Sequence, residues 1–300
     1  MLRRVPSPKH VGEPWALARG DSTFLSILSL LSSCAEGLRV IRNFVDIYDM
    51  AQLNSIARFL NKELRVKSVP DSSRNGLQVR CSKDIKKVGF AVDASLATFE
   101  KAKSKGVDLL IVHHGIKWKR LKDRAGTVKR RIDYLKKHKM NLYVCHLPLD
   151  AHHKYGNNIK LAELLGLSRV KKFGRYKRRY LGYQGVLKPA RSARWIASVL
   201  NKKLKTKCMV LGFGRSKVKS VGIVSGGGAD SLAEAYNKGL GCFITGEAPH
   251  HIYHEAKELK MNMIIAGHYE TETVGVKALM PLLHKKFGVR TFFIHVPTTF

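Results

Sequence analysis

Two kinds of hydrophobic periodicity follow one another along the chain, and the same succession occurs twice. Residues 85–115 and 218–247 each contain an apolar β-branched run, a turn, an amphipathic stretch that includes a Lys-Gly step, and a second apolar run. Such a succession of strand-like and helix-like periods is typical of βαβ units. A third apolar run closes on a histidine in both copies, at residues 139–146 and 260–268. The pattern predicts an α/β fold of two similar βαβ-based halves, which we interpret as an internal duplication.

The segments around the two copies predict further elements and the domain organisation. We expect amphipathic helices at residues 50–64, 157–167, 192–200 and 274–287, a basic helix within 117–139, and strands at 77–79, 182–187 and 291–296. Residues 1–49 match neither copy, so we expect an N-terminal extension that is poorly ordered or not part of the native protein. The rest is expected to divide into a first α/β domain, residues 50–166 plus 273–300, and a second α/β domain, residues 167–272.

The chain is strongly basic, with 55 Lys and Arg against 22 Asp and Glu and a formal net charge of +33. Such a charge favours polyanionic partners such as nucleic acids and nucleotides. The positive charge is densest in residues 167–220, which contain 17 Lys and Arg, no Asp or Glu, and interleaved Tyr and Trp. This composition suits phosphate contacts and base stacking, which makes Leu167–Ser220 a candidate nucleic-acid interface. A general basic adaptation of the whole proteome explains the same stretch equally well.

Cysteine content and hydropathy bear on location. Five cysteines, an odd number without a Cys-x-x-Cys pair, favour a reducing intracellular compartment over a disulfide framework. No stretch approaches the ~18 apolar residues of a membrane span, so no membrane partner is expected. The apolar run at residues 24–31 matches a secretory signal only loosely, because a long and irregular segment precedes it. We therefore expect a cytoplasmic protein.

Histidines and carboxylates follow the apolar runs of both copies. His113 and His114 end the second run of copy one, and in parallel α/β sheets the carboxyl ends of strands are where ligands collect. Neighbouring residues of an extended chain point to opposite sides, so these two imidazoles suit two neighbouring ions. A carboxylate lies four residues past the histidine that closes each third run, Asp150 in copy one and Glu272 in copy two. Together with His268, these residues predict metal half-sites that face each other in a cleft between the halves.

The donor set is typical of a dinuclear centre. Imidazoles, a terminal carboxylate and a bridging carboxylate are expected for two divalent ions held ~3.5–4 Å apart, as in dinuclear hydrolases. Nitrogen and oxygen donors without a thiolate permit Zn, Mn, Fe, Co or Ni. A single histidine in an apolar setting is usually a buried core residue, but matching positions in two copies favour metal binding.

Other candidate residues have less specific patterns. Glu247 occupies in copy two the place of the paired histidines of copy one, so it is a candidate catalytic base, or a residue that orients water or caps a helix. His146 closes the third run of copy one. We expect it to contact the metal ligands rather than to bind metal, because Pro148 changes the backbone path. The clustered histidines at residues 152–153 and 250–254 are expected to be exposed to solvent.

Several separated motifs resemble one known family. They are Asn75-Gly76-Leu77-Gln78-Val79, the DLLIVHHG of residues 108–115, the HLPLDAH of residues 146–152 with Gly156-Asn157-Asn158, Thr245-Gly246-Glu247, and the GHYETE of residues 267–272. Over about residues 50–300 they resemble the GTP cyclohydrolase type-two homologues, also called the NGG-one-interacting-factor-three-like family. The resemblance implies a toroidal homohexamer of two-domain α/β subunits with a dinuclear metal site that faces the internal cavity. Carried over by position, the implied metal ligands are His113, His114, Asp150, His268 and Glu272.

Two functions remain open on this basis. The first is a metal-dependent hydrolase, in which two ions per subunit activate water for attack on an electrophilic carbon or phosphorus. The resemblance implies ring opening of GTP, so a nucleotide or a related small molecule is the expected substrate. Gly226-Gly227-Gly228 lacks the Lys-Ser/Thr of a P-loop and is more typical of a strand-to-helix turn. The second is a nucleic-acid-binding or scaffolding protein whose metals are structural or regulatory.

Overall fold

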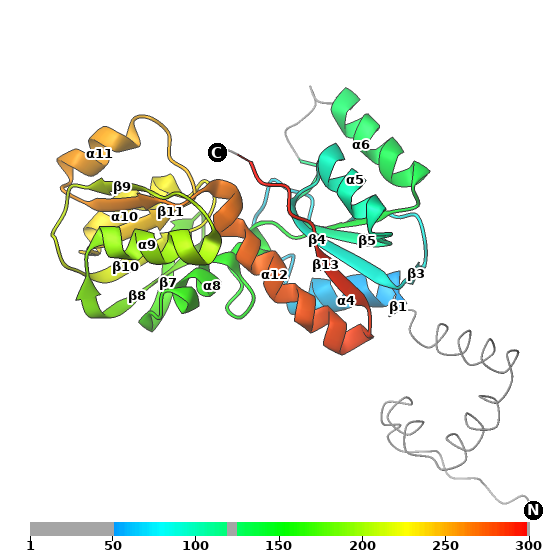
Figure 1. Ribbon diagram of the computed structural model, residues 1–300, viewed down its shortest axis with the longest axis horizontal. Helices are drawn as coiled ribbons and strands as arrows, with labels where there is room; N and C mark the ends of the chain where they lie inside the picture. Colours follow the sequence, from blue (N-terminus) through cyan, green and yellow to red (C-terminus); the bar gives the residue numbers. More distant parts are fainter. Residues whose placement is uncertain (1–50, 119–124, 299–300) are drawn as a thin grey trace, which may run out of the picture. The chain divides into compact units, whose positions relative to one another are not determined.

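Two β-sheets, each with helices on both faces, make up residues 51–118 and 125–298, the part of the chain that this computed structural model describes (Figure 1). These residues belong to one unit, separate from the first 50 residues. The expected extension at residues 1–49 lies outside the described residues. The proposed domain boundaries within residues 50–300 stay a prediction.

The first sheet has five strands in the order β13-β4-β5-β6-β2. The central strands β4, β5 and β6 are parallel, β13 joins β4 in parallel, and β2 pairs with β6 antiparallel. The strands are β2 (Gly76–Val79), β4 (Lys87–Asp93), β5 (Leu109–His114), β6 (Asn141–Val144) and β13 (Arg290–Phe293). A separate pair is formed by β1 (Ala51–Gln52) and β3 (Asp84–Ile85).

The second sheet has six strands in the order β7-β8-β10-β11-β12-β9. Its strands β10, β11 and β12 are parallel, whereas β8 and β9 flank them antiparallel and β7 is an edge strand. The strands are β7 (Ser168–Tyr176), β8 (Arg179–Arg191), β9 (Met209–Gly212), β10 (Val218–Val224), β11 (Cys242–Thr245) and β12 (Asn262–Ile265).

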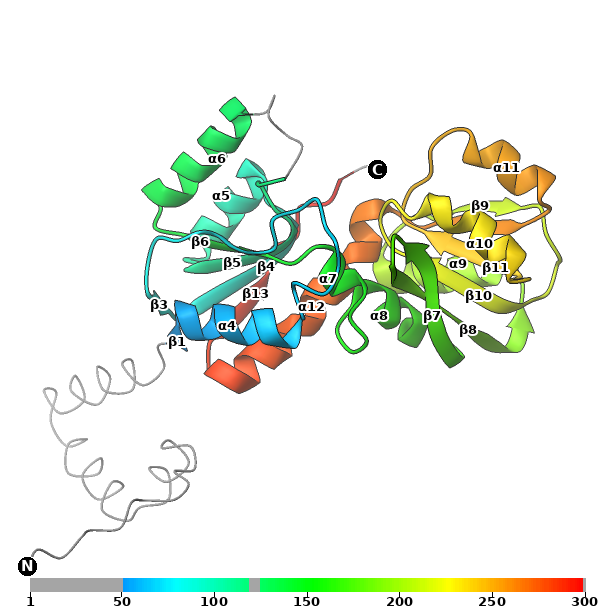
Figure 2. The same cartoon turned by 180° about the vertical axis from the view of Figure 1, so that it is seen from behind.

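Helices cover both faces of each sheet (Figures 1 and 2). On the first sheet, α5 (Leu96–Ser104) and α6 (Ala125–Lys137) pack on one face, and α4 (Leu53–Glu63) and α12 (His268–Phe287) on the other. On the second, α8 (Asn157–Leu164) and α9 (Ala193–Leu204) pack on one face, and α10 (Leu232–Asn237) and α11 (Ile252–Glu258) on the other. None of the helices in the described segments is long and apolar enough to cross a membrane.

The structure agrees with the predicted α/β fold, and the internal duplication stays a prediction that two matched local features support. Asn141 of β6 donates from Nδ2 to the Asp108 carbonyl (2.9 Å), and Asn262 of β12 donates from Nδ2 to the Gly241 carbonyl (3.0 Å). In each case the acceptor directly precedes the neighbouring parallel strand. The lysines two residues before these asparagines both have a left-handed backbone, with φ of 52° and 48°. Such matched local geometry is what an internal duplication would leave.

Helix α12 differs from its prediction. It begins at His268, six residues before the expected start, and runs for 20 residues to Phe287. The predicted boundary between residues 272 and 273 therefore falls inside this helix. Its buried side chains Val276, Leu279 and Leu283 pack in the core of the first half, whereas its first residue follows β12 of the second. One rigid element thus links the two sheets.

Candidate metal centre

The ends of parallel strands from both halves meet at one cluster of histidines and carboxylates. His113 and His114 are the last residues of β5, and His146 lies just after β6. Asp150 closes α7 (Leu147–Asp150), the single helical turn that follows. His268 and Glu272 come from the first five residues of α12. Ligands usually bind at the carboxyl ends of parallel strands, because the loops there can vary while the strands fix where each loop begins.

The metal-ligating atoms of these residues form three overlapping groups, each within 4.8 Å. The groups are His113 with His114 and His146, His114 with His268 and Glu272, and His113 with Asp150 and Glu272. Glu272 belongs to two of them. Its Oε1 lies 3.4 Å from His113 Nε2 and 3.3 Å from His268 Nε2, and its Oε2 lies 3.2 Å from His114 Nε2.

Each of the four imidazoles is held through its Nδ1 atom by an oxygen that can only accept a hydrogen bond. Nδ1 therefore carries the proton, and the lone pair of Nε2 is left for the cluster. The four pairs are His113 with the Cys145 carbonyl at 3.0 Å, His114 with Asp93 at 2.8 Å, His146 with Asp71 at 2.9 Å, and His268 with Glu247 at 2.9 Å.

Several buried nitrogen and oxygen atoms of the cluster lack a hydrogen-bond partner among the described residues. Within residues 51–118 and 125–298, His113 Nε2, His268 Nε2 and Glu272 Oε2 are buried and make no hydrogen bond. Two lone pairs at 3.2–3.4 Å repel each other unless a proton or a metal ion lies between them. The donors are imidazole nitrogens and carboxylate oxygens, which suit divalent transition metals. The residues present therefore fit a metal centre.

The electrostatics of the cluster also favour a cation. Burial alone would lower the pKa of His113, but Asp150 and Glu272 raise it well above its usual value. Burial would likewise lower the pKa of His268, yet Glu272 and Glu247 raise it to about 9. Burial would raise the pKa of Glu272, but the neighbouring imidazoles hold it well below its usual range. A field that favours protons on imidazoles also favours metal ions in the same place.

Asp150 is oriented by two neutral donors. Asn157 Nδ2 donates to Asp150 Oδ1 at 2.8 Å, and Ser225 Oγ donates to the same oxygen at 3.1 Å. The other oxygen, Oδ2, lies 3.4 Å from His113 Nε2. Asn157 is fully buried, and its Oδ1 accepts a hydrogen bond from the Gly275 amide at 2.8 Å. This asparagine therefore fixes Asp150 and the start of α12 relative to each other.

Glu272 is placed by helical spacing and by a close turn. His268 and Glu272 are four residues apart in α12, so their side chains share one face of the helix. Since α12 begins at His268, Glu272 lies in the second turn of the helix. Gly226, with φ of +60°, passes so close to Glu272 that a Cβ there would collide with the carboxylate. The turn after β10 therefore needs glycine for two reasons: its backbone is left-handed, and a side chain would collide with Glu272.

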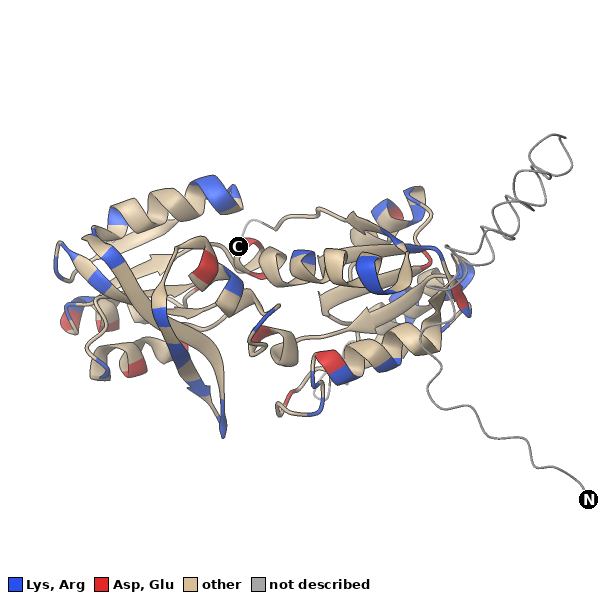
Figure 3. Ribbon diagram, turned by 90° about the horizontal axis from the view of Figure 1, so that it is seen from below, with Lys and Arg blue, Asp and Glu red and all other residues tan. Residues whose placement is uncertain are grey.

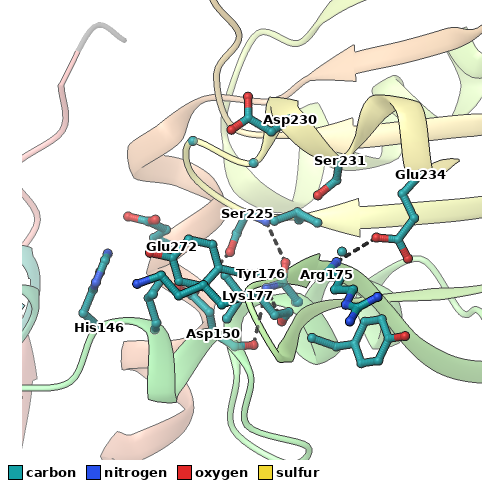
Figure 4. A pocket seen from close by; sticks show the side chains of 18 of the residues that line it. His146, Asp150, Arg175, Tyr176, Lys177, Ser225, Asp230, Ser231, Glu234 and Glu272 are labelled. Atoms are coloured by element: carbon teal, nitrogen blue, oxygen red, sulfur yellow. Dashed lines mark hydrogen bonds between the residues drawn. The ribbon is translucent and has the colours of Figure 1, made fainter. Parts of the chain in front are cut away.

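A large cavity of about 1020 Å³ opens beside the cluster. Its wall includes His114, His146, Asp150, His268 and Glu272. Figure 4 shows His146, Asp150 and Glu272 at one end and Arg175 and Glu234 at the other. There the Arg175 amide donates to a Glu234 oxygen at 2.7 Å. Trp118 also lines the cavity, with its ring 5.0 Å from that of His146 and 6.2 Å from that of His114.

The structure brings all seven predicted site residues together. Glu247 contacts His268, so its position agrees with an orienting role and leaves its catalytic role a prediction. His146 lies in a metal-capable group with His113 and His114, so its Nε2 is as well placed as theirs. Its role as a ligand or as a neighbour of ligands also stays a prediction.

Sequence reasoning missed the partners of the histidines. Asp93 is the last residue of β4, which lies beside β5. Its position at the end of a predicted strand could have marked it as a partner of the histidines. Asp71 lies in a turn-rich loop far from His146 in sequence, and no local pattern marks it. The expectation that His152 is exposed was wrong. It is buried, donates from Nε2 to the Glu63 carbonyl at 3.0 Å, and accepts two backbone amides at Nδ1.

Known proteins resemble this chain over nearly all of its described part. Residues 51–299 match the family described as Duf34/NIF3 (NGG1p interacting factor 3). Proteins named GTP cyclohydrolase 1 type 2 homolog from Archaeoglobus fulgidus and Pyrococcus horikoshii are 42% and 44% identical over 246 residues, which cover 82% of this chain and 98% of each relative. The crystal structure of TTHA1606 from Thermus thermophilus has a TM-score of 0.77 at 38% identity and covers 83% of this chain and 100% of that one. The chain therefore belongs to the Duf34/NIF3 family.

Proposed function

We propose that the cluster binds two divalent ions, drawn from Zn, Mn, Fe, Co and Ni, and that the protein is a metal-dependent hydrolase. The observation that carries this proposal is that His113 Nε2, His268 Nε2 and Glu272 Oε2 are buried without a hydrogen bond within the described residues. Glu272 Oε1 lies 3.4 Å from His113 Nε2 and 3.3 Å from His268 Nε2, and Oε2 lies 3.2 Å from His114 Nε2. When bound, two such ions act as Lewis acids and lower the pKa of a water molecule toward neutrality. The protein supplies a closed set of oriented donors around them.

The proposed ligands are the five residues that the sequence predicts: His113, His114, Asp150, His268 and Glu272. Glu272 would be the carboxylate shared by the two ions, because it alone belongs to both groups that contain carboxylates. Glu247 uses Oε2 to hold His268, which leaves Oε1 on a side chain that is nearly half exposed. We assign this oxygen as the base that takes a proton from water or substrate.

A nucleotide or a related small molecule is the proposed substrate. The cavity of about 1020 Å³ is at the upper end of the ~300–1,000 Å³ of ordinary ligand pockets, so it has room for a whole nucleotide. Trp118 offers an aromatic face beside the cluster, and Arg175 and Lys177 add positive charge to the wall. The names of the relatives, GTP cyclohydrolase 1 type 2 homolog, support the same substrate class.

Metal content and turnover test the proposal together. We expect about two equivalents of divalent metal per chain by elemental analysis after reconstitution, because vicinal histidines that share Glu272 suit two ions better than one. Hydrolysis should be assayed on a panel of nucleotides and phosphoesters. The His268→Ala, Glu272→Ala double variant should lose both metal and turnover.

A matched control exists on α11, where His254 and Glu258 have the same spacing as His268 and Glu272 but are exposed. The His254→Ala, Glu258→Ala variant should keep the wild-type metal content. Less than half an equivalent of metal in the wild type, or equal losses in the two double variants, would contradict the metal centre. Full metal occupancy without turnover of any member of the panel would leave the hydrolase proposal unsupported.

A second candidate function is nucleic-acid binding through residues 167–220. The observation that favours it is the β7–β8 hairpin, whose residues 168–172 and 178–180 are exposed at the sheet edge. Figure 3 shows how far Lys and Arg outnumber Asp and Glu over the ribbon. If this surface binds single-stranded nucleic acid, the logarithm of the affinity should fall with the logarithm of salt by about 0.7 per phosphate contact. An affinity no better than about 10⁻⁴ M at physiological salt would remove this candidate.

The resemblance also supports a closed homo-oligomer, which we propose to be a hexamer. Sedimentation at moderate salt measures it directly, and a monomer at micromolar concentration would exclude the ring. The cytoplasmic location expected from the cysteine content stays a prediction, which fractionation of cells would test.

A further inference from the structure

A second, smaller cavity lies against the β7–β8 hairpin and has a strongly basic wall. Its volume is about 220 Å³. Four of its twelve lining residues carry a permanent positive charge, and none is Asp or Glu. The four are Arg65 after α4, Lys172 in β7, and Arg178 and Arg179 at the hairpin turn. All are exposed, so a dissolved anion can reach them.

The charges of this basic pocket are not neutralised by carboxylates of the described chain. The lysines that form ion pairs within residues 51–118 and 125–298 are others: Lys129, Lys160 and Lys238. Like charges that are close together repel each other even in water. Several cations around so small a space therefore favour an anion between them. Arginine presents a planar fork of donors that matches the oxygens of phosphate.

The hairpin separates this pocket from the metal centre. The basic cluster of residues 171–179 is continuous in sequence, but Arg175 and Lys177 line the large cavity, whereas Lys172, Arg178 and Arg179 line the small one. Tyr180 lines both. None of the proposed metal ligands borders the small cavity. The small cavity is therefore distinct from the proposed metal centre.

We propose that the pocket formed by Arg65, Lys172, Arg178 and Arg179 binds a phosphate group. Its 220 Å³ is below the ~300–1,000 Å³ of pockets that enclose whole ligands, so it takes a single phosphate or a pyrophosphate rather than a nucleotide. The phosphate can belong to a small phosphorylated molecule or to the backbone of a single-stranded nucleic acid that crosses the hairpin. The proposal does not rest on hydrolase activity or on metal binding.

Binding of two probes to the full-length, metal-loaded protein tests the proposal. Calorimetry measures pyrophosphate, and fluorescence anisotropy measures a labelled ten-nucleotide thymidine strand, both at fixed salt. The pocket variant is Lys172→Gln, Arg179→Gln. The matched control is Lys136→Gln, Lys137→Gln on α6, which removes the same charge from exposed lysines that line neither cavity and lie outside residues 167–220. Melting temperature and metal content verify that both variants fold.

We expect the dissociation constant of at least one probe to rise tenfold or more in the pocket variant and to change less than twofold in the control. If pyrophosphate shows the difference, the ligand is a small phosphate; if only the oligonucleotide shows it, the ligand is a phosphodiester backbone. Equal changes in both variants, or no binding of either probe to the wild type, overturn the proposal. Should the double variant fail to fold, Arg178→Gln at the exposed turn serves instead, with an expected loss of threefold or more.

Discussion

Replacement of Asn157 by alanine should affect both stability and metal binding. The side chain is fully buried and makes two hydrogen bonds, to the Asp150 carboxylate and from the Gly275 amide, each 2.8 Å long. A hydrogen bond to a charged group contributes about 1.5–3 kcal/mol, and a buried amide left without a partner costs about 1–3 kcal/mol. We expect the free energy of unfolding to fall by about 3–5 kcal/mol.

Asn158 offers a matched control beside it. Asn158 is equally buried and also makes two strong hydrogen bonds, from the Ser225 amide at 2.6 Å and to the Leu181 carbonyl at 2.9 Å. Its only contact with Asp150, at 3.4 Å, is to the backbone carbonyl. Asn158→Ala should therefore destabilise the protein by a similar amount, about 2–5 kcal/mol. It should loosen the Asp150 carboxylate less than Asn157→Ala does, because Asn158 reaches that carboxylate only through Ser225.

The two variants should separate in metal affinity. Loss of a partner that orients a metal ligand typically costs 10–100-fold in affinity, so Asn157→Ala should bind metal about that much more weakly. Asn158→Ala should lose clearly less metal affinity than Asn157→Ala, because it removes no direct hydrogen bond to the Asp150 carboxylate. Urea unfolding of the metal-free proteins measures stability, and competition with a chelator measures metal affinity. Equal affinity losses in the two variants, or none in Asn157→Ala, would refute the role of Asn157 as a positioning residue.

Three further predictions concern other parts of the chain. Gly226→Ala should destabilise the protein by roughly 1–2 kcal/mol or more, because the backbone at this residue is left-handed. It should also lower the metal content, because the added Cβ would displace the Glu272 carboxylate. Thermal unfolding measures the stability, and elemental analysis measures the metal content. Burial alone would raise the pKa of Asp71, but the contact with His146 outweighs burial and lowers this pKa to about 2. Ionised Asp71 therefore stabilises the fold above about pH 4, and this stabilisation is lost as the pH falls toward 2. The melting-temperature gap between wild type and Asp71→Asn should shrink over that window, and a constant gap would contradict the assignment. A chain that starts at Met50 should keep its metal content and melting temperature, and aggregation of that truncated chain would show that residues 1–49 are needed.

The strand-and-helix succession of the two halves could be read from the sequence because periodicity is a local property. The apolar runs became β4, β5 and β6 in one half and β10, β11 and β12 in the other. The start of α12 could not be read in the same way. Gly267 before it has φ of 87°, and the residues between His268 and Val274 are polar, so no apolar stripe marks that first turn.

The histidines and carboxylates at strand ends were identified from the sequence alone, because parallel strands bring their carboxyl ends to one edge whatever the loops do. What holds those side chains was decided by the tertiary structure. Asp71 meets His146 across 75 residues, and Ser225 meets Asp150 across the same separation. The basic cluster looked like one surface in the sequence, yet the hairpin turn divides it between two cavities. Local pattern specifies which elements form and where their ends lie. Long-range packing alone specifies which polar groups meet, since those contacts depend on the relative placement of elements that are far apart in the chain.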